Sequence, residues 1–393
     1  MATQPPNIVI LGGGSAGWIV ANALAAEWAE YKPAITLVES PTIGTVGVGE
    51  GSTPRLKQFF DRLGIAESEW MPRCNATYKN GIRFAGWSTK PGSDQYFHPF
   101  PTQVDQHTAT AFYHNSAARR QGADVSAHPD EFFLSAYLAK NDLGPKAARQ
   151  FPFLVEYGYH FDAQLLGEFL KEKAMAKGVS HHAAKVTRVE QNKYGDIAAL
   201  CTEAGARVEG DFFVDCSGFV GAMIQKTLKV PFVSFSENLF NDAAVVLPTA
   251  ATDSIASETK STALSCGWAW NIPLTQRRGN GYVYASRYCS ADQAESELRT
   301  HLGLLDRDVD ARHLKMKVGR IEQHWYRNCL AVGLSQGFIE PLEATALNLV
   351  CNTIYDFIET LTRADFKDTG REAFNARVNG GFESIRDYIV AHY

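Results

Sequence analysis

Residues 7–18, Asn-Ile-Val-Ile-Leu-Gly-Gly-Gly-Ser-Ala-Gly-Trp, decide the fold of this chain. The apolar run from Ile8 to Leu11 is typical of a parallel strand that is buried on both faces. Glycines follow at G-x-G-x-x-G spacing, and an alanine-rich segment then predicts a helix from Trp18 onwards. Such a turn lets a pyrophosphate approach the free amides at the start of the helix. We expect these residues of the turn to contact a dinucleotide: Gly12, Gly14, Ser15, Ala16 and Gly17.

An acidic residue stands where dinucleotide binding needs one. The apolar segment Ile35 to Val38 predicts a second strand, and Glu39 follows it. A carboxylate there can accept hydrogen bonds from a ribose and would repel a 2′-phosphate. A glycine triplet by itself is often only a tight turn, but strand, helix and acid occur here in the required order. We therefore predict an α/β fold with a dinucleotide site.

Composition limits the class of protein. The 393 residues, 45% of them hydrophobic, suffice for one large domain or two closely packed ones. No run of 18 apolar residues and no signal peptide is present, so we expect a cytoplasmic protein without a membrane partner. Seven scattered cysteines without a C-x-x-C pair predict neither a disulfide framework nor a metal site. The net charge of −5, without a long basic run, predicts no nucleic-acid partner.

Further along the chain, local patterns predict the remaining elements. The glycine-rich stretch 46–54, with Gly49 and Glu50, is expected to pass close to a flat cofactor, and a helix should follow over 55–63. We predict a loop over 91–130, a helix over 161–177 and a second cofactor-side turn at Gly218. A long helix is expected from about 344 to 361. The sequence stops within a helical pattern, so we expect that a C-terminal portion is missing.

Four motifs outside the glycine turn identify a family. They are Tyr78-Lys79-Asn80, His98-Pro-Phe100, Trp268-x-Trp270-x-Ile272-Pro273 and Glu340-Pro-Leu-Glu-Ala-Thr345. With the glycine turn they resemble the flavin-dependent tryptophan halogenases over the whole length of the chain. The W-x-W-x-I-P signature is complete and is specific among flavoproteins. Two positions depart from the family pattern, since Ala344 stands where many members have Ser and Ala346 where they have Gly.

The resemblance implies an FAD-binding Rossmann-like fold of the glutathione-reductase or aromatic-hydroxylase type. It would have three layers, an added mixed sheet and a helical substrate cover. The chain would form one module of residues 1–393, with an FAD-binding part at about 1–60, 155–225 and 318–365. The substrate-side part would then comprise 61–154, 226–317 and 366–393. Besides the residues of the glycine turn, the expected FAD contacts are Glu39, Gly49, Glu50, Val186, Gly218, Leu334 and Leu347.

The resemblance also implies a chemistry and its residues. Reduced FAD, O₂ and chloride or bromide would give hypohalous acid, which halogenates an indole or another electron-rich aromatic molecule. A separate NAD(P)H-dependent flavin reductase would supply reduced FAD, and the enzyme could form a homodimer. The resemblance assigns catalysis to Lys79 and Glu343, halide binding to Thr345 and Ala346, substrate binding to His98 and Phe100, and a barrier to Trp268 and Trp270.

The same residues also have plainer interpretations. Lys79 could be a surface lysine, or a buried amine that acts as a hydrogen-bond donor or as a nucleophile. Glu343 could pair with an arginine instead of accepting the proton that leaves the ring. Thr345 could simply cap a helix, although a helix start also favours an anion. Trp268 and Trp270 could be ordinary core residues.

Three functions therefore remain open at this point. The first is an FAD-dependent halogenase. The second is a flavin monooxygenase on the same fold, which would lack the intact tryptophan signature and the pair Lys79 and Glu343. The third is a non-catalytic FAD-binding protein, which would consume no reduced flavin.

Overall fold

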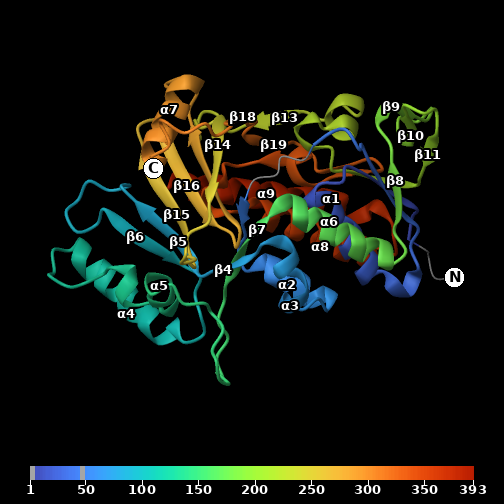
Figure 1. Ribbon diagram of the computed structural model, residues 1–393. Coiled ribbons are helices and arrows are strands. Elements are labelled where there is room, and N and C mark those ends of the chain that lie inside the picture. Colours follow the sequence, from blue (N-terminus) through green and yellow to red (C-terminus); the bar gives the residue numbers. More distant parts are fainter. Residues whose placement is uncertain (1–4, 45–48) are drawn as a thin grey trace.

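The computed structural model describes residues 5–44 and 49–393 and is built on a six-stranded sheet. The strand order is β20-β21-β12-β1-β2-β8, and all neighbours are parallel except β20 and β21. The predicted turn after the first strand thus lies at the carboxyl edge of a parallel sheet. Figure 1 shows β8, the edge strand of this sheet, at the right. The strands are β1 (Ile8–Leu11), β2 (Ile35–Glu39), β8 (Ser180–Ala183), β12 (Phe212–Asp215), β20 (Trp325–Tyr326) and β21 (Cys329–Ala331).

Strand β1 is buried on both faces because its side chains alternate between two cores. Ile8 and Ile10 pack in a core with α1 (Ser15–Glu27), α6 (Ala163–Ala176) and α8 (Ala346–Arg363). Val9 and Leu11 pack in a second core, which includes residues of a small antiparallel sheet. Helices, parallel sheet and small sheet therefore form the three layers expected of the FAD-binding fold. The small sheet consists of β9 (Val186–Gln191), β10 (Ile197–Thr202) and β11 (Arg207–Glu209).

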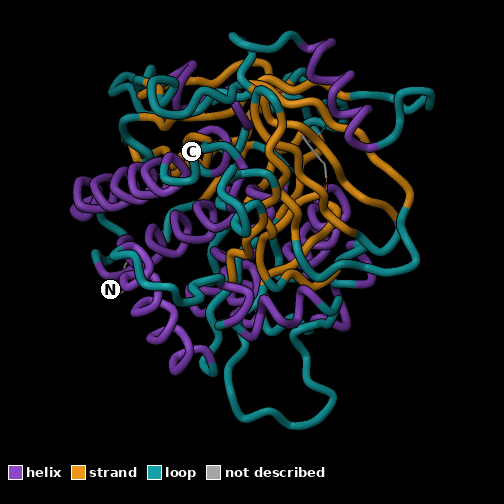
Figure 2. Tube along the Cα trace, turned by 90° about the vertical axis from the view of Figure 1, so that its left-hand side faces the viewer, coloured by secondary structure: helices purple, strands orange, loops and turns teal. Residues whose placement is uncertain are grey.

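A seven-stranded mixed sheet forms the other half of the molecule. Its order is β18-β14-β17-β16-β15-β5-β6, and only the pair β15 and β5 is parallel. Strands cross the centre of the molecule in Figure 2, with long helices on the left-hand side. The strands are β5 (Gly81–Ala85), β6 (Gln95–Pro99), β14 (Ala243–Ala250), β15 (Thr259–Leu264), β16 (Gly267–Pro273), β17 (Arg277–Tyr284) and β18 (Arg312–Lys315).

Two short sheets join these halves. In the first, β7 lies between β3 and β4, so that chain segments from both halves meet in it. In the second, β19 lies between β13 and β22. Their strands are β3 (Gly49–Gly51), β4 (Thr77–Lys79), β7 (Gly158–Asp162), β13 (Phe232–Ser234), β19 (Gly319–Ile321) and β22 (Gly337–Phe338). Of the predicted glycine-rich stretch, residues 46–48 lie outside the described residues.

The prediction of a loop over residues 91–130 was wrong, because β6 and helix α4 (Asp105–Arg120) occupy most of it. Asp105 is the only residue of helix α4 that is buried. The helix therefore buries no apolar stripe, and its sequence shows little apolar periodicity. The Asp105 carboxylate accepts hydrogen bonds from the backbone amides of Thr102, at 2.7 Å, and Leu134, at 2.8 Å. A buried polar anchor therefore holds this helix, and hydrophobic patterning does not detect such an anchor.

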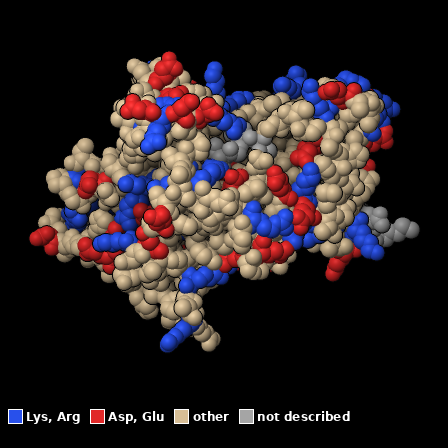
Figure 3. All heavy atoms as spheres, viewed as in Figure 1, with Lys and Arg blue, Asp and Glu red and all other residues tan. Residues whose placement is uncertain are grey.

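The remaining helices surround the two halves. The C-terminal helix α9 brings the end of the chain close to β16 (Figure 1), where Tyr393 interacts with Trp268 of that strand. No helix among residues 5–44 and 49–393 is both long and apolar enough to cross a membrane. On the face drawn in Figure 3, basic side chains (blue) and acidic side chains (red) are interspersed. These helices are α2 (Arg55–Leu63), α3 (Glu67–Trp70), α5 (Leu134–Lys140), α7 (Ala291–Leu302) and α9 (Arg371–Val390).

Candidate active site

Lys79, the last residue of β4, is fully buried. It aligns with Gly158 of β7, in the sheet that joins the two halves. Its Nζ has no hydrogen-bond partner among the described residues. Burial lowers the pKa of Lys79 to about 8, although the negative charge of Glu343 opposes that shift. The surface interpretation of Lys79 is therefore wrong, and the side chain is a desolvated amine that is still mostly charged at pH 7.

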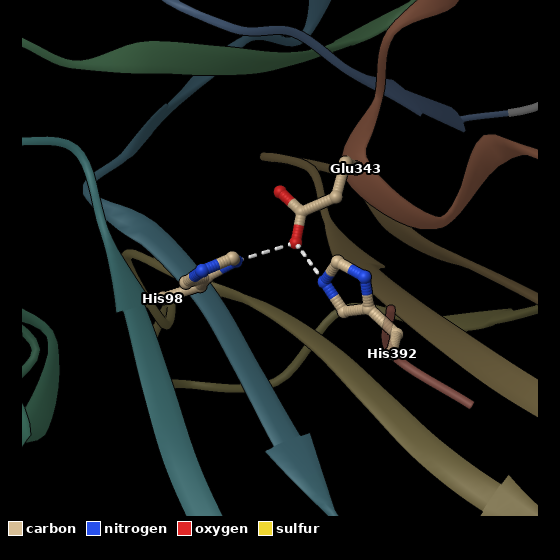
Figure 4. A group of neighbouring side chains, drawn as sticks. All are labelled: His98, Glu343 and His392. Carbon is tan, nitrogen blue, oxygen red and sulfur yellow. Dashed lines mark hydrogen bonds and ion pairs between the residues drawn. The ribbon is translucent and has the colours of Figure 1, made fainter. Parts of the chain in front are cut away.

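Glu343 lies in the turn before α8 and is held by two histidines (Figure 4). Its Oε1 lies 2.6 Å from His98 Nδ1 and 3.1 Å from His392 Nε2. Burial favours the neutral acid, but the hydrogen bonds from both histidines and their charge outweigh it and lower the pKa of Glu343 to about 2. The partners are histidines, so the pairing with an arginine considered above does not occur. Both histidines bind Oε1, which leaves Oε2 clear of them.

His392 was not predicted from the sequence, although it contributes directly to the site. Its Nδ1 lies 2.9 Å from the carbonyl oxygen of Tyr388, while its Nε2 faces Glu343. Both ring nitrogens therefore face acceptors, which favours a doubly protonated ring, and Glu343 raises the pKa of His392 against the effect of burial. Tyr388 and His392 stand four residues apart, which places them on the same face of a helix. This spacing was the signal in the sequence that could have pointed to His392.

The aromatic wall predicted at His98 and Phe100 lies beside these charged groups. The centroid of the Phe100 ring is 5.5 Å from Lys79 Nζ. The His98 ring stacks on Tyr388 of α9, with centroids 5.9 Å apart. It also meets Phe84 of β5 edge-on at 5.8 Å. His98 is thus both a ring surface and a donor to Glu343, and its second role was missed from the sequence.

Trp268 and Trp270 lie on β16, with 1% and 7% of their surface exposed. Their ring centroids are 6.1 Å apart. Trp270 aligns with Gly281 of β17, and a Cβ built there would lie 2.2 Å from the indole Cζ2. The glycine therefore leaves room for the ring. Burial in the main core is compatible with both the barrier and the packing interpretation of these tryptophans.

Helix α8 begins at a strained turn. Ala344 adopts the left-handed conformation, with φ +55°, which residues other than glycine seldom adopt. Thr345 occupies the N-cap position, but its side chain makes no capping hydrogen bond. Its Oγ1 is buried without a partner among the described residues. The interpretation of Thr345 as a simple helix cap is therefore not supported. The buried hydroxyl of Thr345 and the first amides of α8, including that of Ala346, are therefore available to bind an anion.

The glycine turn after β1 packs closely against neighbouring backbone and leaves amides free at the start of α1. Gly12 has φ +116°, and a Cβ there would lie 2.2 Å from the carbonyl oxygen of Cys216. A Cβ on Gly17 would lie 1.9 Å from the Gly12 oxygen. Gly14 caps α1 without any side-chain hydrogen bond, so the amides of the following turn face no capping group. These features fit a dinucleotide.

Glu39 lies over the glycine turn. A Cβ built on Gly13 would lie 1.5 Å from Glu39 Oε2, so Gly13, which we did not predict as a site residue, makes room for the carboxylate. Glu39 Oε1 lies 2.7 Å from both Lys171 Nζ and His181 Nε2. These two side chains fix one oxygen of the carboxylate, and Oε2 points to the turn. An acceptor at this place fits a ribose hydroxyl.

The other expected FAD contacts lie at four places in the fold. Leu334 and Gly218 lie in neighbouring turns beside the glycine turn, since a Cβ on Gly333 would meet Ala16 at 2.8 Å. Leu347 lies in the first turn of α8, and Val186 begins β9 of the small sheet. Gly49 and Glu50 lie on β3, near the mixed sheet. Desolvation, and secondarily the charge of Asp162, raise the pKa of Glu50 to about 7.

Comparison with known proteins places this arrangement in a family. The family model for tryptophan halogenases matches residues 7–393. This chain belongs to the tryptophan halogenase family. It is 38% identical to a tryptophan 6-halogenase of Streptomyces toxytricini, over 99% of this chain and 78% of the relative. It is 33% identical to a tryptophan 7-halogenase of Lentzea aerocolonigenes, over 100% of this chain and 77% of the relative.

Solved structures show the same relationship. The crystal structure of the S. toxytricini enzyme superimposes with a TM-score of 0.87 at 35% identity, covering 98% of this chain and 78% of that one. A flavin-dependent halogenase from Brevundimonas superimposes with a TM-score of 0.86 at 35% identity, over 100% and 78% of the two chains. The protein is therefore an enzyme, a flavin-dependent halogenase. A separate flavin reductase is characteristic of this family, which uses FAD, a halide and O₂.

Proposed function

We propose that this halogenase transfers chlorine or bromine to the indole ring of tryptophan or to another electron-rich aromatic molecule. The observation that carries the proposal is Lys79, a fully buried amine without a hydrogen-bond partner among the described residues. Its Nζ lies 5.5 Å from the centroid of Phe100, at the wall of the candidate substrate site. A buried charge without a partner is unfavourable for folding, so a functional role accounts for it.

FAD would be held by the glycine turn, Glu39 and the surrounding residues, in the part of the chain at about 1–60, 155–225 and 318–365. When bound and reduced, this cofactor would supply hypohalous acid from O₂ and a halide. We assign the halide to Thr345 and Ala346 at the start of α8, where amides and a buried hydroxyl favour an anion. The proposed FAD contacts are Gly12, Gly14, Ser15, Ala16, Gly17, Glu39, Gly49, Glu50, Val186, Gly218, Leu334 and Leu347.

The aromatic substrate would lie on the other side of Trp268 and Trp270, against His98 and Phe100. These tryptophans would keep the organic ring away from the flavin, so that the halogen has to travel to reach it. The ammonium of Lys79 would donate a hydrogen bond to hypohalous acid and polarise it toward the ring. With a pKa of about 8, this group is mostly a charged donor at pH 7, and a smaller fraction is a neutral nucleophile.

Glu343 would accept the proton that leaves the ring after the halogen has added. Its low pKa keeps it ionised, and Oε2 is the oxygen that the two histidines leave clear. His98 and His392 would hold the carboxylate in place and stabilise its charge while the cationic ring is present. The loss of this proton restores aromaticity, so a weak base in the right position is sufficient.

The test is mass spectrometry of a panel of indoles and phenols, incubated with flavin reductase, NADH, FAD and either halide. The proposal expects products that carry the isotope pattern of chlorine or bromine and that form only when halide is present. A hydroxylated product without halogen would instead establish a monooxygenase. Tight FAD binding without consumption of reduced flavin would establish a non-catalytic binding protein.

A further inference from the structure

Two buried polar side chains next to Lys79 have no role in the function described so far. They are His160 on β7, with 0% of its surface exposed, and Thr259 on β15, with 6% exposed. A Cβ built on Gly51 would lie 3.2 Å from Lys79 Nζ, 3.5 Å from Thr259 Oγ1 and 3.6 Å from His160 Cδ2. Three side chains from three strands therefore converge on the same place beside Gly51.

His160 fixes the direction in which the Thr259 hydroxyl points. Thr77 Oγ1 donates its hydrogen to the Pro273 carbonyl oxygen at 2.7 Å, so it accepts a hydrogen from His160 Nδ1, 3.1 Å away. Burial, and then the charge of Lys79, lower the pKa of His160, so the ring is neutral and its Nε2 is an acceptor. Thr259 Oγ1, 2.8 Å from Nε2, therefore donates to His160. Only oxygen lone pairs remain on the side of Lys79.

Thr259 also lies between the tryptophans and the aromatic wall. Strand β15 separates β16 from β5 and β6 in the mixed sheet. Thr259 aligns with Ile82, which aligns with His98, so these three side chains share one face. Two residues further along β15, Ser261 aligns with Trp270, and its buried Oγ has no partner among the described residues. This face therefore offers polar oxygens between the proposed flavin side and the proposed substrate side.

We propose that Thr259 binds hypohalous acid together with Lys79, and that His160 is a positioning residue that orients Thr259. The inference rests on the proposed function. Hypohalous acid has one O–H donor and an oxygen that accepts. Lys79 donates to that oxygen, and Thr259 accepts the O–H hydrogen. The halogen takes part in neither hydrogen bond and is left to face the aromatic ring. No bond is made or broken in this binding step.

The test compares Thr259→Val, which removes the hydroxyl at similar size, with Thr259→Ser, which retains it. Two quantities are measured: halogenated product per reduced flavin oxidised, and hypohalous acid that escapes and is trapped in solution as the N-haloamine of taurine. In the Val variant we expect a fall of about tenfold or more in product, with more escaped oxidant and an unchanged rate of flavin oxidation. The Ser variant should stay within about twofold of the wild type.

A second readout needs no flavin. NMR titration of Lys79 in the FAD-free protein should give a lower pKa in Thr259→Val than in the wild type, because a polar group near the ammonium is replaced by an apolar one. Thr262→Val is the matched control, since this residue lies on the same strand but points to the opposite face. The control should leave product yield and the pKa of Lys79 unchanged. If Thr259→Val does not fold, Thr259→Ala carries the same test.

The outcomes separate this inference from the function on which it rests. Wild-type protein that halogenates, with a Thr259→Val variant of normal yield and normal oxidant escape, overturns the inference and leaves the proposed function standing. Wild-type protein that makes no halogenated product overturns the proposed function and the inference with it. Equal losses in Thr259→Val and Thr262→Val assign a packing role to this strand and overturn the inference as well.

Discussion

At the scale of single residues, the site consists of charged side chains whose burial lowers stability, which indicates a functional role. Lys79 was predicted as a site residue only through its motif, because lysine at this spacing is otherwise a surface residue. Its burial results from the pairing of β4 with β7, which joins residues about 80 positions apart in the sequence. The pair formed by His98 and Glu343 spans 245 positions, and no local pattern predicts such a contact.

The burial of Lys79 should reduce stability. Its pKa of about 8 lies below the ordinary 10.5, so the folded protein binds fewer protons between these pH values than the unfolded chain does. Stability should therefore rise as pH increases through this window, and the full penalty should be present below pH 8. Lys79→Met should raise the free energy of unfolding by about 3 kcal/mol at pH 7, because folding lowers the pKa of Lys79 from 10.5 to about 8. Chemical denaturation at pH 7 and pH 10 measures this, and a variant less stable than wild type at pH 7 contradicts it.

His98 should control the acid side of the pH profile. His98→Phe keeps an aromatic ring but removes one of the two hydrogen bonds that lower the pKa of Glu343. The pKa of the carboxyl should then rise toward its ordinary value, because burial is opposed by one partner fewer. As the pH is lowered, product formation should begin to fall at a higher pH in the variant than in the wild type. The pH dependence of kcat measures this shift, with oxidation of reduced flavin as the control.

At the scale of elements, strong local patterns were predicted well and polar ones poorly. The strand, glycine turn and helix at residues 8–27 follow from apolar runs and glycine spacing, and the structure confirms them. Helix α4 was missed because a buried aspartate holds it, and hydrophobic packing contributes little. Helix α9 was expected as a helix, but its contribution of Tyr388 and His392 to the site depends on how it packs.

Two glycines of the first turn should respond differently to valine. Gly14 has φ −73°, which any residue adopts, so Gly14→Val should fold and mainly fill the space above the start of α1. We expect its affinity for FAD to fall by about tenfold or more. Gly17→Val should destabilise the fold itself, since even a Cβ there would lie 1.9 Å from a backbone oxygen. Fluorescence titration with FAD and thermal melting separate the two effects, and unchanged FAD affinity in Gly14→Val would mean that the placement is wrong.

At the scale of the whole molecule, two halves meet at the small sheet of β3, β7 and β4. The parallel sheet carries the glycine turn and Glu39, whereas the mixed sheet carries the tryptophans and the aromatic wall. Lys79 ends the strand at which these halves join. The family and the fold could be predicted from motifs, but the roles of His392 and Thr259 could not. Both depend on contacts between strands and helices that are distant in the sequence.

The central claim is that flavin chemistry and halogen transfer occur at separate places, and Lys79→Met tests it most directly. Methionine is close to lysine in length but lacks the charged donor. The variant should bind FAD and oxidise reduced flavin at wild-type rates, while halogenated product falls by about 100-fold or more. Both rates are measured in the same reaction, with reductase, NADH, O₂ and halide. Near-normal halogenation by Lys79→Met would contradict the account, because free hypohalous acid would then be doing the chemistry.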